Sequence, residues 1–149
     1  MSVFEFEPAA AGDADALAAL RVAAMRESLE HLGRFDPERA RRRLLDRFDA
    51  GCTRHVRTAQ GRVGFVVLRE RPDGHWLLDH LYIHPDAQGA GLGAAVLAAL
   101  FAEADARQRD LHVGALRDSR SNHFYARHGF TLVEQQAWDN LYVRRAAAA

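Results

Sequence analysis

A run of alternating glycines lies between a predicted strand and a predicted helix in the middle of this chain. Residues 76–83 are rich in leucine, aromatic and β-branched residues, as in a strand, and residues 92–101 are rich in alanine and leucine, as in a helix. Glycines permit positive φ angles and close backbone approach, so successive N–H groups can converge on one point. The glycines are Gly89, Gly91 and Gly93. Because a helix N-terminus adds partial positive charge, the segment predicts a pyrophosphate-binding loop.

The spacing of the glycines distinguishes between known kinds of phosphate-binding loop. A dinucleotide fingerprint requires G-x-G-x-x-G and a nucleotide P-loop ends in Gly-Lys-Ser/Thr, and neither pattern occurs here. The residues instead match Gln/Arg-x-x-Gly-x-Gly/Ala at Gln88, Gly91 and Gly93. After a Leu-Tyr-Ile strand and a His-Pro, this loop resembles the coenzyme A site of the GCN5-related N-acetyltransferases (GNAT). For the glycines alone, a tight strand-to-helix connection without a ligand is the alternative.

A second motif supports the resemblance to the same family. Residues 121–130, Ser-Asn-His-Phe-Tyr-Ala-Arg-His-Gly-Phe, resemble its F-Y-x-x-x-G-F signature at the expected distance downstream. Gly129 lies where a glycine ends a helix, and Phe130 begins the next predicted strand. The two motifs occur in the family's order, so the chain is identified by resemblance as a member of the GNAT family.

Length and composition limit the classes of protein to which the chain can belong. With 149 residues, 48% hydrophobic and 27% charged, it has the size and composition of one soluble globular domain. The net charge is zero and the pI is near 7.1, which does not indicate nucleic acid or an anionic membrane as a partner. No segment is apolar for long enough to span a bilayer, and the N-terminus does not resemble a signal peptide. We therefore expect a cytoplasmic protein.

Cysteine, histidine and lysine usage gives further limits. The single Cys52 excludes an intramolecular disulfide and a multi-cysteine metal site, and the eight histidines are scattered, so no metal is expected. All twenty basic residues are arginine. Together with the abundant alanine, this indicates GC-rich codon usage and a bacterial source.

Hydrophobic periodicity and turn residues predict the order β-α-α-β-β-β-α-β-α-β-β. The strands are expected at residues 3–7, 53–59, 62–69, 76–83, 111–116, 130–133 and 141–143. The helices are expected after Asp13, after Asp36, over 92–107, and around Tyr125 with Asp118 or Ser119 as its cap.

This order is that of the GNAT fold, and the resemblance implies an α/β (mixed α+β) single-domain acyl-CoA N-acyltransferase fold. Its central sheet would be mostly antiparallel, with a splayed parallel strand pair, flanked by about four helices. We expect the domain to cover residues 1–145 and the alanines of 146–149 to be frayed.

The resemblance also implies a set of residues that bind acetyl-CoA. The backbone of the strand would pair with the pantetheine arm, and an N–H near Leu81 or Tyr82 would polarise the thioester carbonyl. The family often has Asn seven residues before its Tyr, where this chain has Asp118, so Asn122 is the candidate that replaces it, unless it faces solvent. The expected cofactor-binding residues are Leu81, Tyr82, Ile83, Gln88, Gly89, Ala90, Gly91, Leu92, Gly93, Asn122 and Tyr125.

Three residues are candidates for proton transfer. Tyr125 occupies the family's proton-donor position, and a phenol keeps its proton at pH 7; packing in the core is the alternative. Asp79 lies in an otherwise apolar run, where desolvation would raise its pKa and suit a base. His80 begins closer to a neutral pKa and is the second candidate. Deprotonation through water, with no single base, stays open.

The expected reaction is direct acetyl transfer from acetyl-CoA to a primary amine, most simply that of a small molecule. A protein or peptide N-acetyltransferase and a non-catalytic acyl-CoA-binding sensor are the alternatives. The arginine cluster of residues 39–47 could attract an acidic acceptor or the coenzyme's 3′-phosphate, but a solvated helix face is the preferred explanation. Family members often dimerise, so a homodimer is an open option, although no strand edge in the sequence indicates one.

Overall fold

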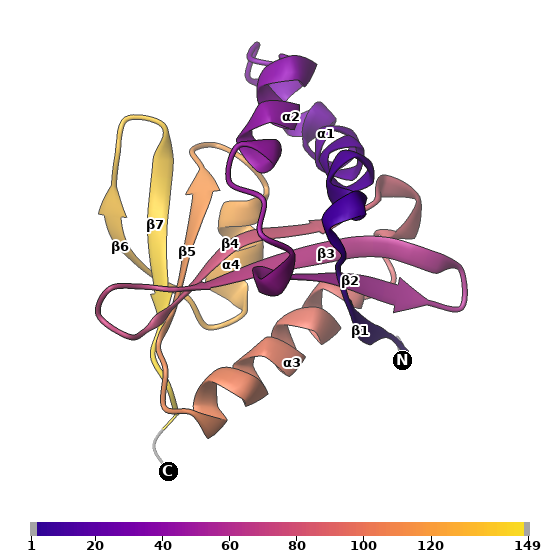
Figure 1. Cartoon of the computed structure of the whole chain (residues 1–149). Coiled ribbons are helices and arrows are strands. Elements are labelled where there is room, and N and C mark those ends of the chain that lie inside the picture. Colours follow the sequence, from indigo (N-terminus) through magenta and orange to yellow (C-terminus); the bar gives the residue numbers. More distant parts are fainter. Residues whose placement is uncertain (1–2, 148–149) are drawn as a thin grey trace. The chain divides into compact units, whose positions relative to one another are not determined.

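The computed structural model describes residues 3–147 (Figure 1). The strands are β1 (Glu5–Pro8), β2 (Thr53–Thr58), β3 (Gly61–Glu70), β4 (Trp76–Ile83), β5 (Leu111–Leu116), β6 (Thr131–Gln135) and β7 (Asp139–Arg144). The α-helices are α1 (Ala14–His31), α2 (Pro37–Leu45), α3 (Leu92–Ala106) and α4 (Ser121–Arg127). Short 3-10 turns cover Ala11–Asp13, Ala50–Cys52 and Pro85–Ala87. Within the described chain, no helix is both long and apolar enough to cross a membrane.

All seven strands belong to one sheet, in the order β1-β2-β3-β4-β5-β7-β6. The pairs β1–β2, β2–β3, β5–β7 and β6–β7 are antiparallel, whereas β4 and β5 are parallel. The parallel pairing joins Trp76, Leu77 and Leu78 to Leu111, His112 and Val113, which are only three residues of each strand. The expected mixed fold, with one short parallel pair in a mostly antiparallel sheet, is confirmed.

The chain forms two compact units. The first contains the described residues up to Val67 together with His80–Gly93, and the second contains Leu68–Asp79 together with the described residues from Ala94 onward. Each unit has its own packing and is described by itself.

In the first unit, α1 and α2 pack on one face of the β2–β3 hairpin. The core cluster contains Leu17 and Ala18 of α1, Leu44 of α2, and Phe65 and Val67 of β3, each at most 2% exposed. As predicted, Pro37 begins α2 and the Asp36 carboxylate accepts the Arg39 N–H at 3.1 Å, which caps the helix. The alternation of apolar residues in β3 therefore positions the two N-terminal helices.

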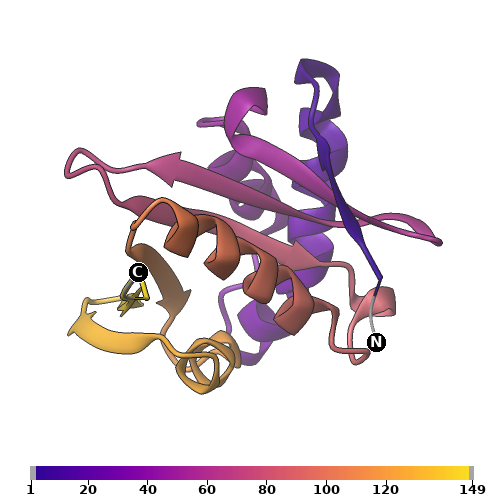
Figure 2. The same cartoon turned by 90° about the horizontal axis from the view of Figure 1, so that it is seen from below.

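In the second unit, α4 packs against β5 and β6; Figure 2 shows α4 nearly end-on beside the C-terminal strands. Val96, Leu97, Leu100 and Ala104 of α3 are fully buried. The Arg144 guanidinium lies over the Phe101 ring and donates to both carboxylate oxygens of Asp105, at 2.8 and 3.0 Å. One β7 side chain therefore anchors the second half of α3.

Two details of the second unit differ from the expectations. Neither Asp118 nor Ser119 caps α4: the N-cap is Arg120, which makes no side-chain cap bond, and Asp118 has a left-handed φ of 68°. Of the expected frayed tail, Ala148 and Ala149 lie outside the described residues. The N–H groups of Ala146 and Ala147 donate to Asp110 and Asp105, both at 2.9 Å.

Candidate functional site

The loop that follows β4 is tied to the strands of the first unit. The His84 N–H donates to the Val63 carbonyl of β3 at 2.7 Å, and the His84 ring nitrogen Nδ1 accepts the Asp86 N–H at 3.1 Å. The Gln88 side-chain amide donates to the Ile83 carbonyl at 2.9 Å. Gln88 therefore closes the turn by binding back to the end of β4, so its side chain positions the glycines that follow.

The glycine segment presents exposed backbone N–H groups at the start of α3. Gly89 and Gly91 have φ angles of 88° and 78°, which only glycine adopts without strain, and residues 88–91 are all exposed. Within residues 3–147, the N–H groups of Gly89 and Gly91 have no hydrogen-bond partner. The helix begins at Leu92, and the N–H groups of its first turn have no partner within the helix. This arrangement can bind an anion with several oxygen atoms.

Gly64 permits a close approach of β3 to β4 that the sequence did not reveal. A Cβ atom at position 64 would lie 2.6 Å from the Tyr82 carbonyl oxygen and 2.7 Å from Cδ1 of Ile83. Both residues belong to the strand expected to bind pantetheine. The sequence feature that could have indicated this close approach is an isolated glycine inside the apolar run of residues 63–67. A glycine inside a strand often marks close backbone contact.

His80 and Tyr82 form an aromatic cluster with Phe65 in the first unit. The His80 ring centroid lies 5.7 Å from that of Tyr82 and 6.2 Å from that of Phe65, and Tyr82 lies 5.7 Å from Phe65. Since Phe65 belongs to the core cluster with α1 and α2, His80 and Tyr82 lie on the face of the sheet that these helices cover. The Arg21 guanidinium of α1 lies 5.5 Å from the Tyr82 ring centroid, a contact that no local pattern in the sequence indicated.

The position of Asp79 in the sequence indicated apolar surroundings. In the structure, Asp79 instead has a charged neighbour. The Arg69 Nε–H of β3 donates to Oδ2 of Asp79 at 2.8 Å, and the two side chains are 16% and 20% exposed. The expectation of apolar surroundings was therefore wrong. The arginine that corrects it lies ten residues earlier and becomes a neighbour through the strand pairing.

Tyr125 is buried near the C-terminus of α4 in the second unit, with 6% exposure. Its ring contacts those of Phe124, Phe130 and Tyr142, at centroid distances of 5.5, 5.3 and 6.3 Å. Its carbonyl accepts the N–H of Phe130 at 3.1 Å, across the turn at Gly129, whose φ is 94°. The predicted helix end at Gly129 is confirmed, and the spacing of the motif has a structural cause in this turn.

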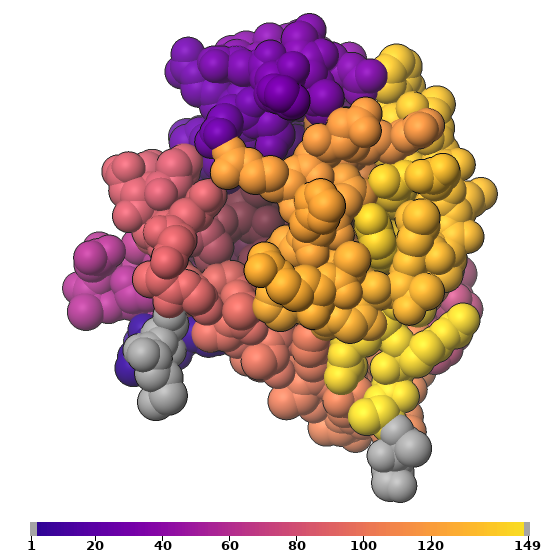
Figure 3. All heavy atoms as spheres, turned by 180° about the vertical axis from the view of Figure 1, so that it is seen from behind, coloured from indigo at the N-terminus to yellow at the C-terminus, as the bar shows by residue number. Residues whose placement is uncertain are grey.

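Asn122 uses its whole side-chain amide within the second unit. Its Nδ2 donates to the carbonyls of Leu116 and Ser119, both at 2.9 Å, and its Oδ1 accepts from Asn140 Nδ2 and Tyr142 Oη, both at 2.8 Å. An amide has two donors and two acceptor sites, so all four are occupied. Figure 3 shows α4 in orange beside the yellow C-terminal strands. A direct contact of Asn122 with a cofactor stays a prediction, and one of these bonds would have to be given up for it.

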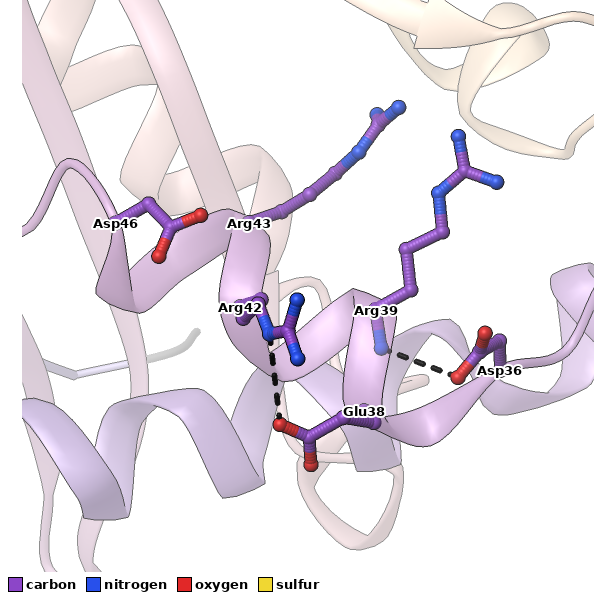
Figure 4. Close-up of a pocket in the computed structure, with 6 residues that line it drawn as sticks. All are labelled: Asp36, Glu38, Arg39, Arg42, Arg43 and Asp46. Atoms are coloured by element: carbon purple, nitrogen blue, oxygen red, sulfur yellow. Dashed lines mark hydrogen bonds and ion pairs between the residues drawn. The ribbon is translucent and has the colours of Figure 1, made fainter.

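Three of the four arginines of α2 line a surface hollow of about 410 Å³ (Figure 4). Arg42 lies 3.8 Å from the Glu38 carboxylate, and Arg41 donates to Asp15 at 2.7 Å. Arg39 and Arg43 extend from the same side of the helix in Figure 4. The hollow is lined by Asp36, Glu38, Arg39, Arg42, Arg43 and Asp46. Its mixed charges fit the solvated helix face better than a dedicated anion site. Among residues 3–147, no three His, Cys, Asp or Glu side chains gather as a metal site would require.

The candidate residues thus form two groups. His80, the strand residues 81–83 and the loop 88–93 lie in the first unit, and Asp79, Asn122 and Tyr125 lie in the second. The mixed sheet with one short parallel pair, followed by a glycine loop at the start of α3, is the arrangement that the resemblance to the GNAT fold implied. The acetyltransferase (GNAT) domain family matches residues 51–132, more than half of the chain. The chain belongs to this family.

Solved structures show the same fold. PaiA N-acetyltransferase from Thermoplasma acidophilum, in complex with coenzyme A, superposes with a TM-score of 0.78 at 12% identity, covering 96% of this chain and 99% of that chain. An acetyltransferase from Thermus thermophilus gives a TM-score of 0.75 at 23% identity, covering 97% and 99%. No curated protein matches the chain significantly in sequence.

Proposed function

We propose that this protein transfers the acetyl group of acetyl-CoA to a primary amine of a small molecule, by direct attack of the amine. The open N–H groups of Gly89 and Gly91 beside the start of α3 carry this proposal. They fit the pyrophosphate of coenzyme A, because exposed amides and a helix N-terminus favour a multiply charged anion. The similar PaiA structure contains coenzyme A, which agrees with this assignment.

The residues of β4 would hold the acyl end of the coenzyme. The backbone of Leu81, Tyr82 and Ile83 would pair with the pantetheine amides as an added strand does. An N–H of Leu81 or Tyr82 would donate to the thioester carbonyl and stabilise negative charge that develops on its oxygen. When bound, acetyl-CoA supplies an acetyl thioester that an amine can attack. The close packing at Gly64 would keep this part of β4 in place.

His80 is the better-supported base. It lies in the aromatic cluster with Tyr82, the residue whose backbone would bind the thioester, whereas Asp79 is paired with Arg69. A neutral imidazole can accept the proton of an ammonium acceptor near pH 7. One oxygen of the Asp79 carboxylate is already engaged by Arg69. Tyr125 would protonate the leaving thiolate, since a phenol still carries its proton at this pH.

A thiol-release assay over a panel of amines tests the proposal. Amino acids, polyamines, aminoglycosides and short peptides would each be supplied with acetyl-CoA, and free coenzyme A would be measured. Release that depends on a small amine supports the proposal. Release only with peptides would favour a peptide N-acetyltransferase. Tight binding of acetyl-CoA by calorimetry, with no release for any amine, would favour a non-catalytic sensor.

A further inference from the structure

Arg21 has the unusual property of a permanent charge that is buried in the first unit. Its side chain, in the second turn of α1, belongs to a residue only 5% exposed. Among the residues that the structure describes, it is the one buried Asp, Glu, Lys or Arg. Such residues are rarely buried without an ionic partner, because removing a charge from water costs several kcal/mol.

The contacts of Arg21 do not neutralise this charge. Its Nη1 donates to the Ala40 carbonyl of α2 at 2.6 Å, and its guanidinium lies over the Tyr82 ring. Within residues 3–147, no carboxylate lies within ion-pair distance of it. Its Nε is buried and has no hydrogen-bond partner there. One neutral carbonyl and one ring face leave the charge largely uncompensated.

The free atoms of Arg21 lie on one edge of the guanidinium. Since Nη1 is engaged by Ala40, the Nε–H and the parallel N–H of Nη2 remain, and these two donors form the side-on fork of an arginine. This fork matches the two oxygens of a carboxylate in a bidentate pair. The bond to Ala40 ties α1 to α2, but it does not require a charged group, because a neutral amide would make it as well.

The surroundings of Arg21 connect this fork to the proposed reaction. Arg21 covers one part of the Tyr82 ring, and the His80 ring lies 5.7 Å from the same ring. The Arg21 fork, the Tyr82 ring and the candidate base His80 therefore belong to one cluster. Tyr82 lies in the segment that would bind the thioester. We propose that Arg21 binds the carboxylate of the acceptor, so that the acetylated substrate is a carboxylate-bearing amine such as an amino acid.

This inference rests on the proposed acetyl transfer and specifies its substrate class. A carboxylate fits better than a phosphate, because one guanidinium balances one negative charge. The hydrogen-bonded fork would reject an acceptor in which an uncharged group replaces the carboxylate, since the buried donors would then be left without an acceptor.

The first experiment measures the preference for a carboxylate. Amino acids, their α-carboxamides and the corresponding decarboxylated amines would be compared by kcat/KM, in the wild type and in R21K. We expect the wild type to prefer the carboxylate by about 10²-fold or more. R21K keeps the charge but cannot form the fork, so this ratio should fall about tenfold or more, mainly through KM. R26K is the matched control, since Arg26 lies on the exposed part of α1 and pairs with Glu30 at 2.7 Å. It should keep the wild-type ratio.

The second experiment does not depend on turnover. Thermal unfolding of the wild type and R21K would be followed with N-acetyl amino acids, their amides or inorganic phosphate, with and without coenzyme A. Carboxylate ligands should raise Tm in the wild type and much less in R21K. Equal effects of carboxylates and amides, or stabilisation by phosphate alone, would overturn the inference.

The two proposals fail in different ways. If carboxylates stabilise the protein through Arg21 but coenzyme A does not bind by calorimetry, the acetyltransferase proposal fails and the carboxylate site stands. If coenzyme A binds and amines are acetylated regardless of a carboxylate, the acetyltransferase proposal stands and the role of Arg21 is wrong.

Discussion

The Nε–H of Arg69 donates to Oδ2 of Asp79 across 2.8 Å, between adjacent strands β3 and β4. This ion pair occupies one oxygen of the Asp79 carboxylate and holds the side chain against β3. Asp79 therefore has a structural explanation that does not involve the substrate, and His80 is left as the side chain to test for proton transfer.

We expect His80→Gln to lower kcat/KM by about 10²-fold and to remove the acidic limb of its pH profile, because that limb would report the protonation of the base. Asp79→Asn is the matched comparison on the neighbouring position. It should lower thermal stability through loss of the Arg69 pair but keep the shape of the pH profile. If Asp79→Asn removes the acidic limb and His80→Gln keeps it, Asp79 is the base. Two unchanged profiles would indicate deprotonation through water.

Tyr125→Phe removes one hydroxyl and keeps the ring contacts with Phe124, Phe130 and Tyr142. If the phenol protonates the leaving thiolate, kcat should fall about 10²-fold while the affinity for acetyl-CoA is kept. Tyr142→Phe is the control, because its hydroxyl donates to Asn122 at 2.8 Å and its loss should cost about 1 kcal/mol of stability with little effect on kcat. Wild-type turnover of the Tyr125 variant would leave this tyrosine with a packing role only.

Gly91→Asp should abolish binding of coenzyme A. Gly91 has a φ of 78° in an exposed loop, so the variant adds both backbone strain and a negative charge where the pyrophosphate would bind. Calorimetry would measure binding, and circular dichroism would show whether the fold persists. Gly91→Asn separates the two effects, since asparagine tolerates this φ and carries no charge. Unchanged affinity in a folded Gly91→Asp protein would disprove the location of the pyrophosphate site.

The second unit should lose stability in acid through Asp105. Hydrogen bonds from Arg144, and then from the Ala147 N–H, lower the pKa of Asp105 from 3.8 to about 2. Because the folded-state pKa is depressed, the stabilisation is present above about pH 4 and is lost as the pH falls through about 2. Asp105→Asn should therefore lower Tm at neutral pH, and the difference from wild type should shrink between about pH 4 and about pH 2.

Much of the fold could be predicted because local patterns determine it. The bounds of β4 and β5 agree with the prediction. The turn at residues 72–74 and the His84-Pro85 break delimit β4, and a polar turn precedes β5. The left-handed backbone at Gly89 and Gly91 was also predictable, because glycine adopts positive φ angles without strain, whereas binding of coenzyme A by this loop stays a prediction. The helix end at Gly129 followed from a single residue type.

The features of the candidate site that the sequence did not predict depend on residues that are distant in sequence. Asp79 was misjudged because Arg69 becomes its neighbour only when β3 and β4 pair. The bonds of Asn122 end on Asn140 and Tyr142 of β7, eighteen and twenty residues later. The sequence analysis did not single out Arg21, since its burial arises only when α2 and Tyr82 pack beside it. The left-handed Asp118 could not be distinguished from a helix cap by residue type alone.

The two glycine environments near the proposed coenzyme site would respond differently to chirality. At Gly89, φ is 88° and an added Cβ would meet nothing within 4 Å, so the requirement is for a left-handed backbone. A D-alanine introduced there by chemical synthesis suits that φ and should preserve the loop, whereas L-alanine should strain it. At Gly64 the obstacle to an L residue is the Tyr82 carbonyl at 2.6 Å, so the requirement is for space. The chirality of the residue therefore decides which substitutions Gly89 tolerates, and the volume of the side chain decides which substitutions Gly64 of β3 tolerates.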